Sequence, residues 1–366
     1  MFLTIITFVV VLGVIIFVHE LGHFLTARKF GVKVEEFGFG FPPRIWGKKK
    51  GDTTYSINWI PLGGFVKIKG ESGEDKNDPD SFSYQKPWKR AIILSAGVIM
   101  NIILAFVLLS IGFMIGLPSV VEDNMSGTFV SDRKIQIVEV SPDTVAASLN
   151  LKTGDEILSI DGQSFGSTVS MTEYIKQDQD GILNLEIARL SGDVSVVADL
   201  TNVEPKVLGV YLADTGLVKY TWWQAIISGF KATGYILAQI VVAFYLLLKA
   251  LIMGTGTSME VAGPVGVAVI TGQMARLGIA HVLQFTALFS LNLAVINIIP
   301  FPALDGGRLL FVLIEKIRRK PNNENIEALV HNIGFIILLI LIFVITYKDI
   351  AKYGTQIIGA FGRLFS

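Results

Sequence analysis

Long apolar stretches alternate with polar segments along this chain of 366 residues. Four stretches reach the roughly 20 apolar residues that a helix needs to cross the hydrocarbon core of a membrane. They are 2–27, 91–117, 282–304 and 328–347. The third contains Pro300 and Pro302, so we expect its last turns to be bent or unwound, which at membrane depth is tolerated where the backbone lines a cavity. The pattern predicts a polytopic α-helical membrane protein with about four transmembrane helices.

Two segments between these stretches alternate polar and apolar residues with a period of two, as β-strands do. One is 32–70, where we expect a membrane-associated β-region. The other is 118–206, which contains runs such as Lys134-Ile-Gln-Ile-Val-Glu-Val140. It predicts a small water-soluble α+β domain, inserted between the second and third spans.

Residues 232–248 are uncharged and apolar, but they only approach the lower length limit of a span. We predict an interfacial or re-entrant helix here, folded back near Gly254-Thr-Gly256 and Gly263-Pro-Val-Gly266, and two short crossings remain an alternative. The predicted organisation is then an N-terminal membrane domain, an inserted domain, an amphipathic linker region and a C-terminal membrane domain, at 1–117, 118–206, 207–275 and 276–366.

The distribution of charge predicts the orientation in the membrane. Residues 28–90 carry 13 Lys and Arg against 8 Asp and Glu, whereas residues 118–231 carry 8 against 16. Because Lys and Arg accumulate in cytoplasmic loops, we expect the first loop in the cytoplasm and the inserted domain outside it. The basic segment Glu315-Lys-Ile-Arg-Arg-Lys320 is then cytoplasmic as well.

Composition narrows the chemistry. A hydrophobic fraction of 51% with 17% charged residues is too apolar for an ordinary soluble domain. The formal net charge of +0 gives no field that favours nucleic acid, so no nucleic-acid partner is expected. The chain has no cysteine, which excludes disulfides and thiolate ligands. A bound metal would therefore be held by histidine and carboxylate.

The segment His19-Glu-Leu-Gly-His23 carries the clearest chemistry, and it lies inside the first apolar stretch. Positions i and i+4 of a helix share one face, so both imidazoles can bind one Zn²⁺ with Glu20 beside it. Zinc then needs a third protein ligand and an open position for water, and Glu20 is the candidate catalytic base. Ionisable side chains within an apolar span are costly and generally face a functional cavity, so a purely structural role is the weaker interpretation.

Asp305 is the predicted third metal ligand. It ends an uncharged run of 28 residues that begins at Leu277, and it precedes Gly306-Gly307, which permit close approach of the backbone. His281 is the next candidate ligand, and an interfacial aspartate that caps a following helix is the structural alternative. If Asp305 meets the two histidines at one depth, 232–248 does not simply cross the membrane.

The pairing of His19-Glu-Leu-Gly-His23 with Asn297-Ile-Ile-Pro-Phe-Pro-Ala-Leu-Asp-Gly-Gly307 resembles the site-2 protease family, specifically its bacterial RseP-like branch with an inserted PDZ domain. The resemblance extends over nearly the whole chain. It implies that His19, His23 and Asp305 bind zinc and that Glu20 is the catalytic acid and base.

The resemblance also implies substrate-binding roles for two asparagines. Asn297 corresponds to the asparagine before the prolines, which in the family helps to hold the substrate backbone. Asn101 ends Ser95-Ala-Gly-Val-Ile-Met-Asn101, which is similar to a family stretch of the second span, but Val98 stands where proline is usual. Residues 32–70 look like the family's membrane-embedded β-region, which is thought to pair with an unwinding substrate.

Within the inserted domain, Leu151-Lys-Thr-Gly-Asp-Glu-Ile-Leu-Ser-Ile-Asp-Gly162 resembles a stretch of PDZ domains, and a plain turn between strands is the alternative. PDZ domains add a peptide strand to a sheet edge. Only one such unit fits within 118–206, so a single PDZ-like domain is expected.

The sequence thus predicts a multi-pass, zinc-dependent intramembrane endopeptidase of the bacterial inner (cytoplasmic) membrane, with its active site toward the cytoplasm. The expected partners are the lipid bilayer, single-span membrane proteins such as anti-sigma factors or remnant signal peptides, and peptide C-termini or extracytoplasmic segments at the PDZ-like domain. A catalytically silent scaffold and a metal transporter are the alternatives. The intact Glu20 and the appended peptide-binding domain favour hydrolysis.

Overall fold

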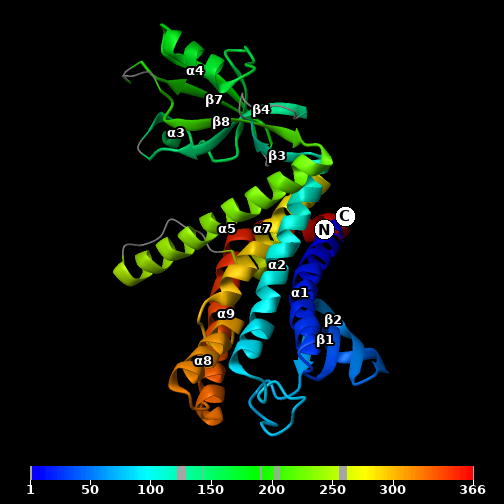
Figure 1. Cartoon of the computed structure of the whole chain (residues 1–366). Coiled ribbons are helices and arrows are strands. Elements are labelled where there is room, and N and C mark those ends of the chain that lie inside the picture. Colours follow the sequence, from blue (N-terminus) through cyan, green and yellow to red (C-terminus); the bar gives the residue numbers. More distant parts are fainter. Residues whose placement is uncertain are drawn as a thin grey trace. The chain divides into compact units, whose positions relative to one another are not determined.

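The computed structural model describes residues 2–121, 129–142, 144–189, 192–201, 203, 207–254 and 262–365. The chain divides into two compact units (Figure 1). The first, here called the membrane unit, consists of residues 1–110 and 226–366. The second, the inserted unit, consists of residues 111–225.

Long apolar helices dominate the membrane unit. Figure 1 shows α1, α2, α7 and α9 running alongside one another. Their bounds are α1 Phe2–Lys29, α2 Pro87–Ile115, α7 Ile279–Ile298 and α9 Glu324–Phe365. They coincide with the four predicted spans, and α7 ends before Pro300, where a bend was expected. Among the described residues five helices are long and apolar enough to cross a membrane, these four and α5 (Trp222–Met253). The chain has the architecture of a membrane protein.

The segment expected to form a short helix over 232–248 belongs to α5, one continuous helix of 32 residues. Most of the predicted turn at Gly254-Thr-Gly256 lies outside the described residues. The chain is described again from residue 262, and α6 (Pro264–Leu277) follows Gly263. Two backbone amides at the start of α6, of Gly263 and Gly266, donate to the buried carboxylate of Asp349 on α9.

Between α1 and α2 the chain forms two long antiparallel strands, β1 (Val34–Lys50) and β2 (Thr53–Ile68). This agrees with the strands expected over 32–70. Both strands bend, so that Phe37 of β1 faces Val66 on one side and Tyr55 on the other. The last part of β2, residues 64–68, is therefore an outer strand. The base of the hairpin packs with α1 and α2 in a core that includes Phe24, Phe37 and Ile93.

The inserted unit is built on a six-stranded sheet in the order β3-β8-β4-β5-β6-β7. The strands are β3 (Leu117–Val120), β4 (Phe129–Val140), β5 (Glu156–Ile160), β6 (Ile182–Ala188), β7 (Val194–Asp199) and β8 (Val210–Lys219), with helices α3 (Val145–Ser148) and α4 (Thr168–Gln177). Strand β8 pairs with both β3 and β4, so the sheet continues to Lys219, past the limit expected at residue 206. Leu183, Leu185 and Ile187 of β6 alternate into its core, as the period of two predicts.

Candidate zinc site and its relatives

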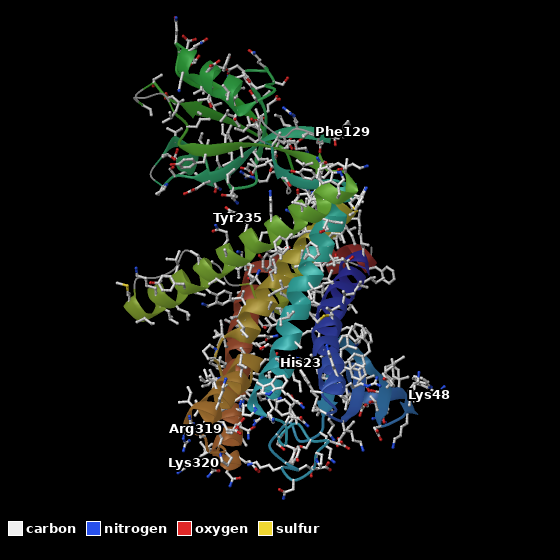
Figure 2. The ribbon with its side chains drawn as sticks, in the orientation of Figure 1. His23, Lys48, Phe129, Tyr235, Arg319 and Lys320 are labelled. Atoms are coloured by element: carbon white, nitrogen blue, oxygen red, sulfur yellow. The ribbon has the colours of Figure 1, made fainter. Side chains whose placement is uncertain are left out.

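His19 and His23 lie one turn apart on the same face of α1, and both are buried. Their Nε2 atoms are 3.2 Å apart. Asp305 begins α8 (Asp305–Arg318), and its Oδ2 lies 3.0 Å from Nε2 of His19 and 3.4 Å from Nε2 of His23. Residues nearly 300 positions apart in the sequence thus converge on one point, which Figure 2 places by the label of His23.

The spacing of these three atoms fits a tetrahedral zinc ion. Bonds of about 2.0–2.2 Å put neighbouring ligand atoms about 3.3 Å apart. Oδ2 of Asp305 is also buried and has no hydrogen-bond partner among the described residues, as expected of an atom that binds a cation. This is the one cluster of three or more potential ligands in the described part of the chain. His281 is not part of this cluster. It lies in the first turn of α7, about 24 Å along the helix from Asn297, which lies in the last turn, at the end that leads to Asp305.

Helix α2 fixes the ring orientation of both histidines. Nδ1 of His23 lies 2.9 Å from the carbonyl oxygen of Ile93, which can only accept, so Nδ1 carries the proton and Nε2 is free to bind metal. Nδ1 of His19 lies 3.3 Å from the amide group of Asn101. The oxygen of that amide is buried and has no hydrogen-bond partner among the described residues, and a half-turn of the group would let it accept from Nδ1 of His19. The same tautomer then follows for His19.

Two glycines allow α1 and α2 to approach this closely. A Cβ atom on Gly22 would meet the backbone of Ala96, and one on Gly97 would lie 2.8 Å from Nε2 of His19. Sequence reasoning did not assign a role to either glycine. The signal was present in Ser95-Ala-Gly97, because small residues in apolar helices mark close helix packing.

The turn that presents Asp305 also depends on small residues. A Cβ atom on Gly306 would collide with the carbonyl groups of Ile298 and Ile299, and one on Gly307 with that of Phe301. The expectation that this glycine pair permits close approach of the backbone is confirmed. The start of α8 can therefore fold back against the end of α7, which brings Asp305 to the histidines.

Glu20 and the two asparagines have different surroundings. Oε2 of Glu20 accepts a hydrogen bond of 3.1 Å from the backbone amide of Val66 in the outer strand of the hairpin. Asn297 lies half-buried in the last turn of α7, and its side chain makes no hydrogen bond with a described residue. Asn101, in contrast, has no exposed surface and lies behind His19.

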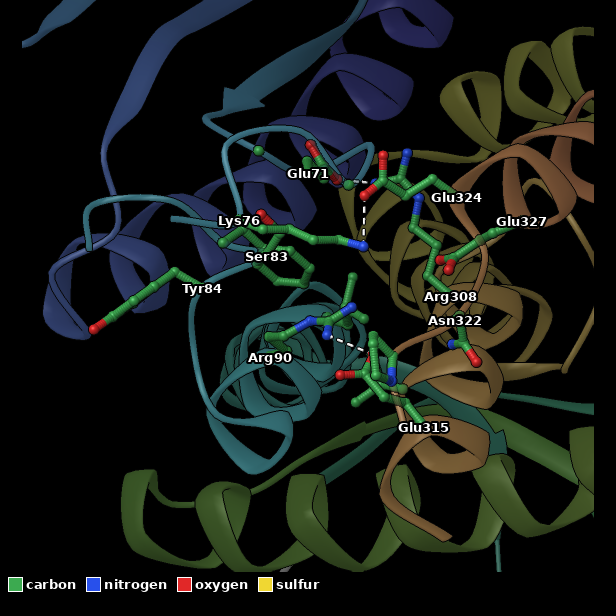
Figure 3. A pocket seen from close by; sticks show the side chains of 16 residues that line it. Glu71, Lys76, Ser83, Tyr84, Arg90, Arg308, Glu315, Asn322, Glu324 and Glu327 are labelled. Atoms are coloured by element: carbon green, nitrogen blue, oxygen red, sulfur yellow. Dashed lines mark hydrogen bonds and ion pairs between the residues drawn. The ribbon is translucent and has the colours of Figure 1, made fainter. Parts of the chain in front are cut away.

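A polar cavity of about 240 Å³ lies close to the zinc site, between the segment that follows β2 and the helices α8 and α9 (Figure 3). Ion pairs cross it. Nζ of Lys76 lies 2.5 Å from Glu324, and Nη1 of Arg90 lies 2.8 Å from Glu315. Arg308, one turn after Asp305 on α8, pairs with Glu71. The segment that follows the hairpin is thus tied to α8 by Glu71 and to α9 by Lys76, and α2 is tied to α8 by Arg90.

The sequence profile of peptidase family M50 matches residues 7–341. The chain belongs to peptidase family M50. This match confirms the predicted resemblance to the site-2 protease family. It also confirms that the chain is a zinc metalloprotease, as predicted, and not a metal transporter or a catalytically silent scaffold.

Curated relatives of this M50 chain span almost its entire length. A Clostridium perfringens protein named as a zinc metalloprotease is 34% identical, over 92% of this chain and 95% of its own. The regulator of sigma-W protease RasP of Bacillus subtilis is 29% identical, over 95% and 98%. The zinc metalloprotease RasP of Geobacillus kaustophilus is 28% identical, over 96% and 98%.

A solved PDZ domain of an SdrC-like protein from Listeria monocytogenes covers 23% of the chain at 25% identity, with a TM-score of 0.21. The corresponding domain from Listeria innocua covers 22% at 24% identity, with a TM-score of 0.20.

Proposed function

We propose that this M50 protease cleaves peptide bonds within the transmembrane segments of single-span membrane proteins. One observation carries the proposal: the two histidines of the candidate zinc cluster lie on α1, a helix of 28 residues that is apolar enough to span the bilayer. His19, His23 and Asp305 are the proposed zinc ligands, and Glu20 the proposed catalytic residue. A site at this depth can act on peptide bonds inside the membrane, which soluble proteases cannot reach.

Zinc, when bound, lowers the pKa of a coordinated water and polarises the peptide carbonyl. Glu20 follows His19 directly, and its carboxylate is close enough to interact electrostatically with His19, His23 and Asp305. It is placed to accept a proton from the attacking water as the oxygen bonds to the carbonyl carbon. When the C–N bond breaks, Glu20 can deliver that proton to the departing amine nitrogen.

A transmembrane substrate keeps its peptide groups in intrahelical hydrogen bonds, so it must unwind before water can attack. The outer strand at the end of β2 offers replacement partners, because an extended peptide can add to a free strand edge. Asn297, whose amide is not used by a described residue, is the proposed further contact for the substrate backbone. Asn101 is enclosed behind His19, and we propose that it orients that ligand, whereas its predicted contact with substrate has no support from its position.

We further propose that the ends of the membrane helices near the zinc site face the cytoplasm of a bacterial cell. Figure 2 shows Lys48, Arg319 and Lys320 toward the end of the helical bundle at which α1 carries His23. Basic residues of this kind favour the cytoplasmic side. The inserted unit would then be extracytoplasmic, where its sheet could bind peptide termini or extracytoplasmic segments of substrates.

The path of the chain through the membrane unit supports the expectation that α5 does not simply cross. Gly229 of α5 packs against Ser110 of α2, and α6 begins against Asp349 of α9 and passes Thr4 of α1. At the 1.5 Å rise per residue of a helix, Ser110 lies roughly 20 Å from the level of the zinc site, and Thr4 and Asp349 lie roughly 25–27 Å from it. The chain leaves and re-enters the bundle at the same end. This supports four crossings, with α5 at the interface.

The test is the change Glu20→Gln in the full-length protein, purified in detergent. We expect the variant to retain stoichiometric zinc but to lose cleavage of a single-span test substrate by a factor of at least 10³, since only the proton acceptor is removed. Asp305→Asn is the companion variant and should lose zinc, whereas His281→Asn should keep it. Continued cleavage by Glu20→Gln would refute the mechanism.

A further inference from the structure

The turn before Asp305 adopts a backbone conformation that its sequence does not favour. Residues 299–304 connect α7 to α8, and within them Ala303 has φ of +77°. This is the left-handed region, which is unfavourable for alanine because its Cβ atom comes too close to the backbone, and which glycine adopts without this penalty. Asp305 follows two residues later, so the direction of the zinc ligand depends on this conformation being held.

The imidazole of His331 on α9 holds this turn. Its Nδ1 accepts a hydrogen bond of 2.9 Å from the backbone amide of Ala303. Three residues further along α9, Gly334 lies against the turn so closely that a Cβ atom there would collide with Pro302. Phe311 of α8 packs on the ring of His331, with centroids 5.5 Å apart. The histidine therefore contacts both the turn and the helix that starts with Asp305.

The position of the ring proton on His331 indicates that this side chain serves as a hydrogen-bond acceptor for the turn. Because Nδ1 accepts from an amide, the ring proton is on Nε2, and that buried atom has no hydrogen-bond partner among the described residues. A leucine would avoid this unpaired donor but would leave the amide of Ala303 without an acceptor. The one side-chain hydrogen bond described for His331 is the one to the turn.

We propose that His331 is a positioning residue for Asp305: it keeps Ala303 in the left-handed conformation and so brings the carboxylate of Asp305 against His19 and His23. The inference rests on the proposed function only in taking Asp305 as a zinc ligand. It gives a role to a histidine that lies outside both chemical motifs of the sequence.

The test compares His331→Asn with His331→Leu in the full-length protein. The two new side chains have the same branched skeleton of non-hydrogen atoms, but only asparagine can accept from the amide of Ala303. Zinc affinity, measured by competition with a chelator, should fall at least about tenfold in His331→Leu and about threefold or less in His331→Asn, in line with the effect of residues that orient metal ligands. Hydrogen–deuterium exchange of residues 299–307 should be faster in metal-free His331→Leu than in the metal-free wild type. His281→Leu serves as the matched control on α7.

The double variant His331→Leu/Ala303→Gly decides between positioning and simple packing. Glycine adopts positive φ without penalty, so it should restore much of the zinc affinity that His331→Leu loses. Equal losses in the leucine and asparagine variants, or no recovery with Ala303→Gly, would overturn the proposal. So would a His331→Leu protein that fails to fold with either residue at position 303. Both readouts are independent of proteolysis, so an active Glu20→Gln variant would refute the proposed function without touching this result.

Discussion

The backbone amide of Val66 donates a hydrogen bond of 3.1 Å to Oε2 of Glu20. The proposed catalytic carboxylate thus lies on the edge of the hairpin to which we expect the substrate to add. A substrate strand that paired with residues 64–68 would compete for this amide. Its arrival would release Glu20 toward the zinc site.

Val66→Pro tests this relationship, because proline removes the amide hydrogen and is tolerated on an outer strand. We expect zinc content to be unchanged and kcat/KM for a single-span substrate to fall at least about tenfold, because the substrate loses a backbone partner. Val66→Ala keeps the amide and should stay near the wild-type rate. Equal activity of the proline and alanine variants would show that this edge does not bind substrate.

Gly97→Ala addresses the close approach of α2 to the zinc site. The added Cβ atom would lie 2.8 Å from Nε2 of His19, so either the helices separate or the imidazole turns away. We expect the zinc affinity to fall about 10- to 100-fold, as for other disturbances of ligand orientation. Gly234→Ala on α5 is the control, since a Cβ atom there meets nothing within 4 Å. Metal analysis of the two purified variants is sufficient, and full zinc binding by Gly97→Ala would contradict the site geometry.

The inserted unit offers a prediction of pH dependence. Arg189 donates to both carboxylate oxygens of the buried Asp155, at 2.7 and 2.5 Å. Burial acts to raise the pKa of Asp155, but Arg189 and the amide of Lys152 outweigh it, and the pKa lies below its ordinary value of 3.8. Since the folded-state pKa is the lower one, the pair stabilises the unit above about pH 4, and this contribution is lost as the pH falls through the lowered pKa.

Arg189→Gln should therefore reduce the free energy of unfolding of the inserted unit by about 2–4 kcal/mol at pH 7, because a buried carboxylate is left unpaired. The difference from the wild type should shrink toward pH 3. Hydrogen–deuterium exchange of β5 and β6 in the full-length protein measures both effects. Lys176→Gln, at an exposed position of α4, should change stability by less than about 0.5 kcal/mol. A difference that grew on acidification would show that the sign is wrong.

The proposed orientation can be tested by cysteine labelling, because the chain has no cysteine of its own. Single cysteines at Lys219 and Arg318, both exposed, report on the inserted unit and on the end of α8. We expect an impermeant maleimide to label Lys219→Cys in intact cells and Arg318→Cys only after permeabilisation. Labelling of both positions from outside would mean that α5 crosses the membrane.

The sequence by itself determined the ligand types and their pattern. His19 and His23 share a helix face because their spacing is four residues, and the apolar length of the surrounding segment predicts a membrane helix. Both are local properties of the chain, so no knowledge of distant contacts was needed. The strands within 32–70 and the end of α7 before Pro300 follow from local pattern in the same way.

Only the tertiary structure decided how these parts meet. That Asp305 rather than His281 joins the histidines depends on how the chain folds around the start of α8. There Gly306 and Gly307 lie against the end of α7 and the turn that follows it, and Ala303 takes a left-handed conformation beside α9. The burial of Asn101 behind His19 and the contact of Glu20 with Val66 likewise arise between segments far apart in the chain. Hydrophobic periodicity reports which face of an element is buried, but it carries no information about which distant backbone group will lie against that face.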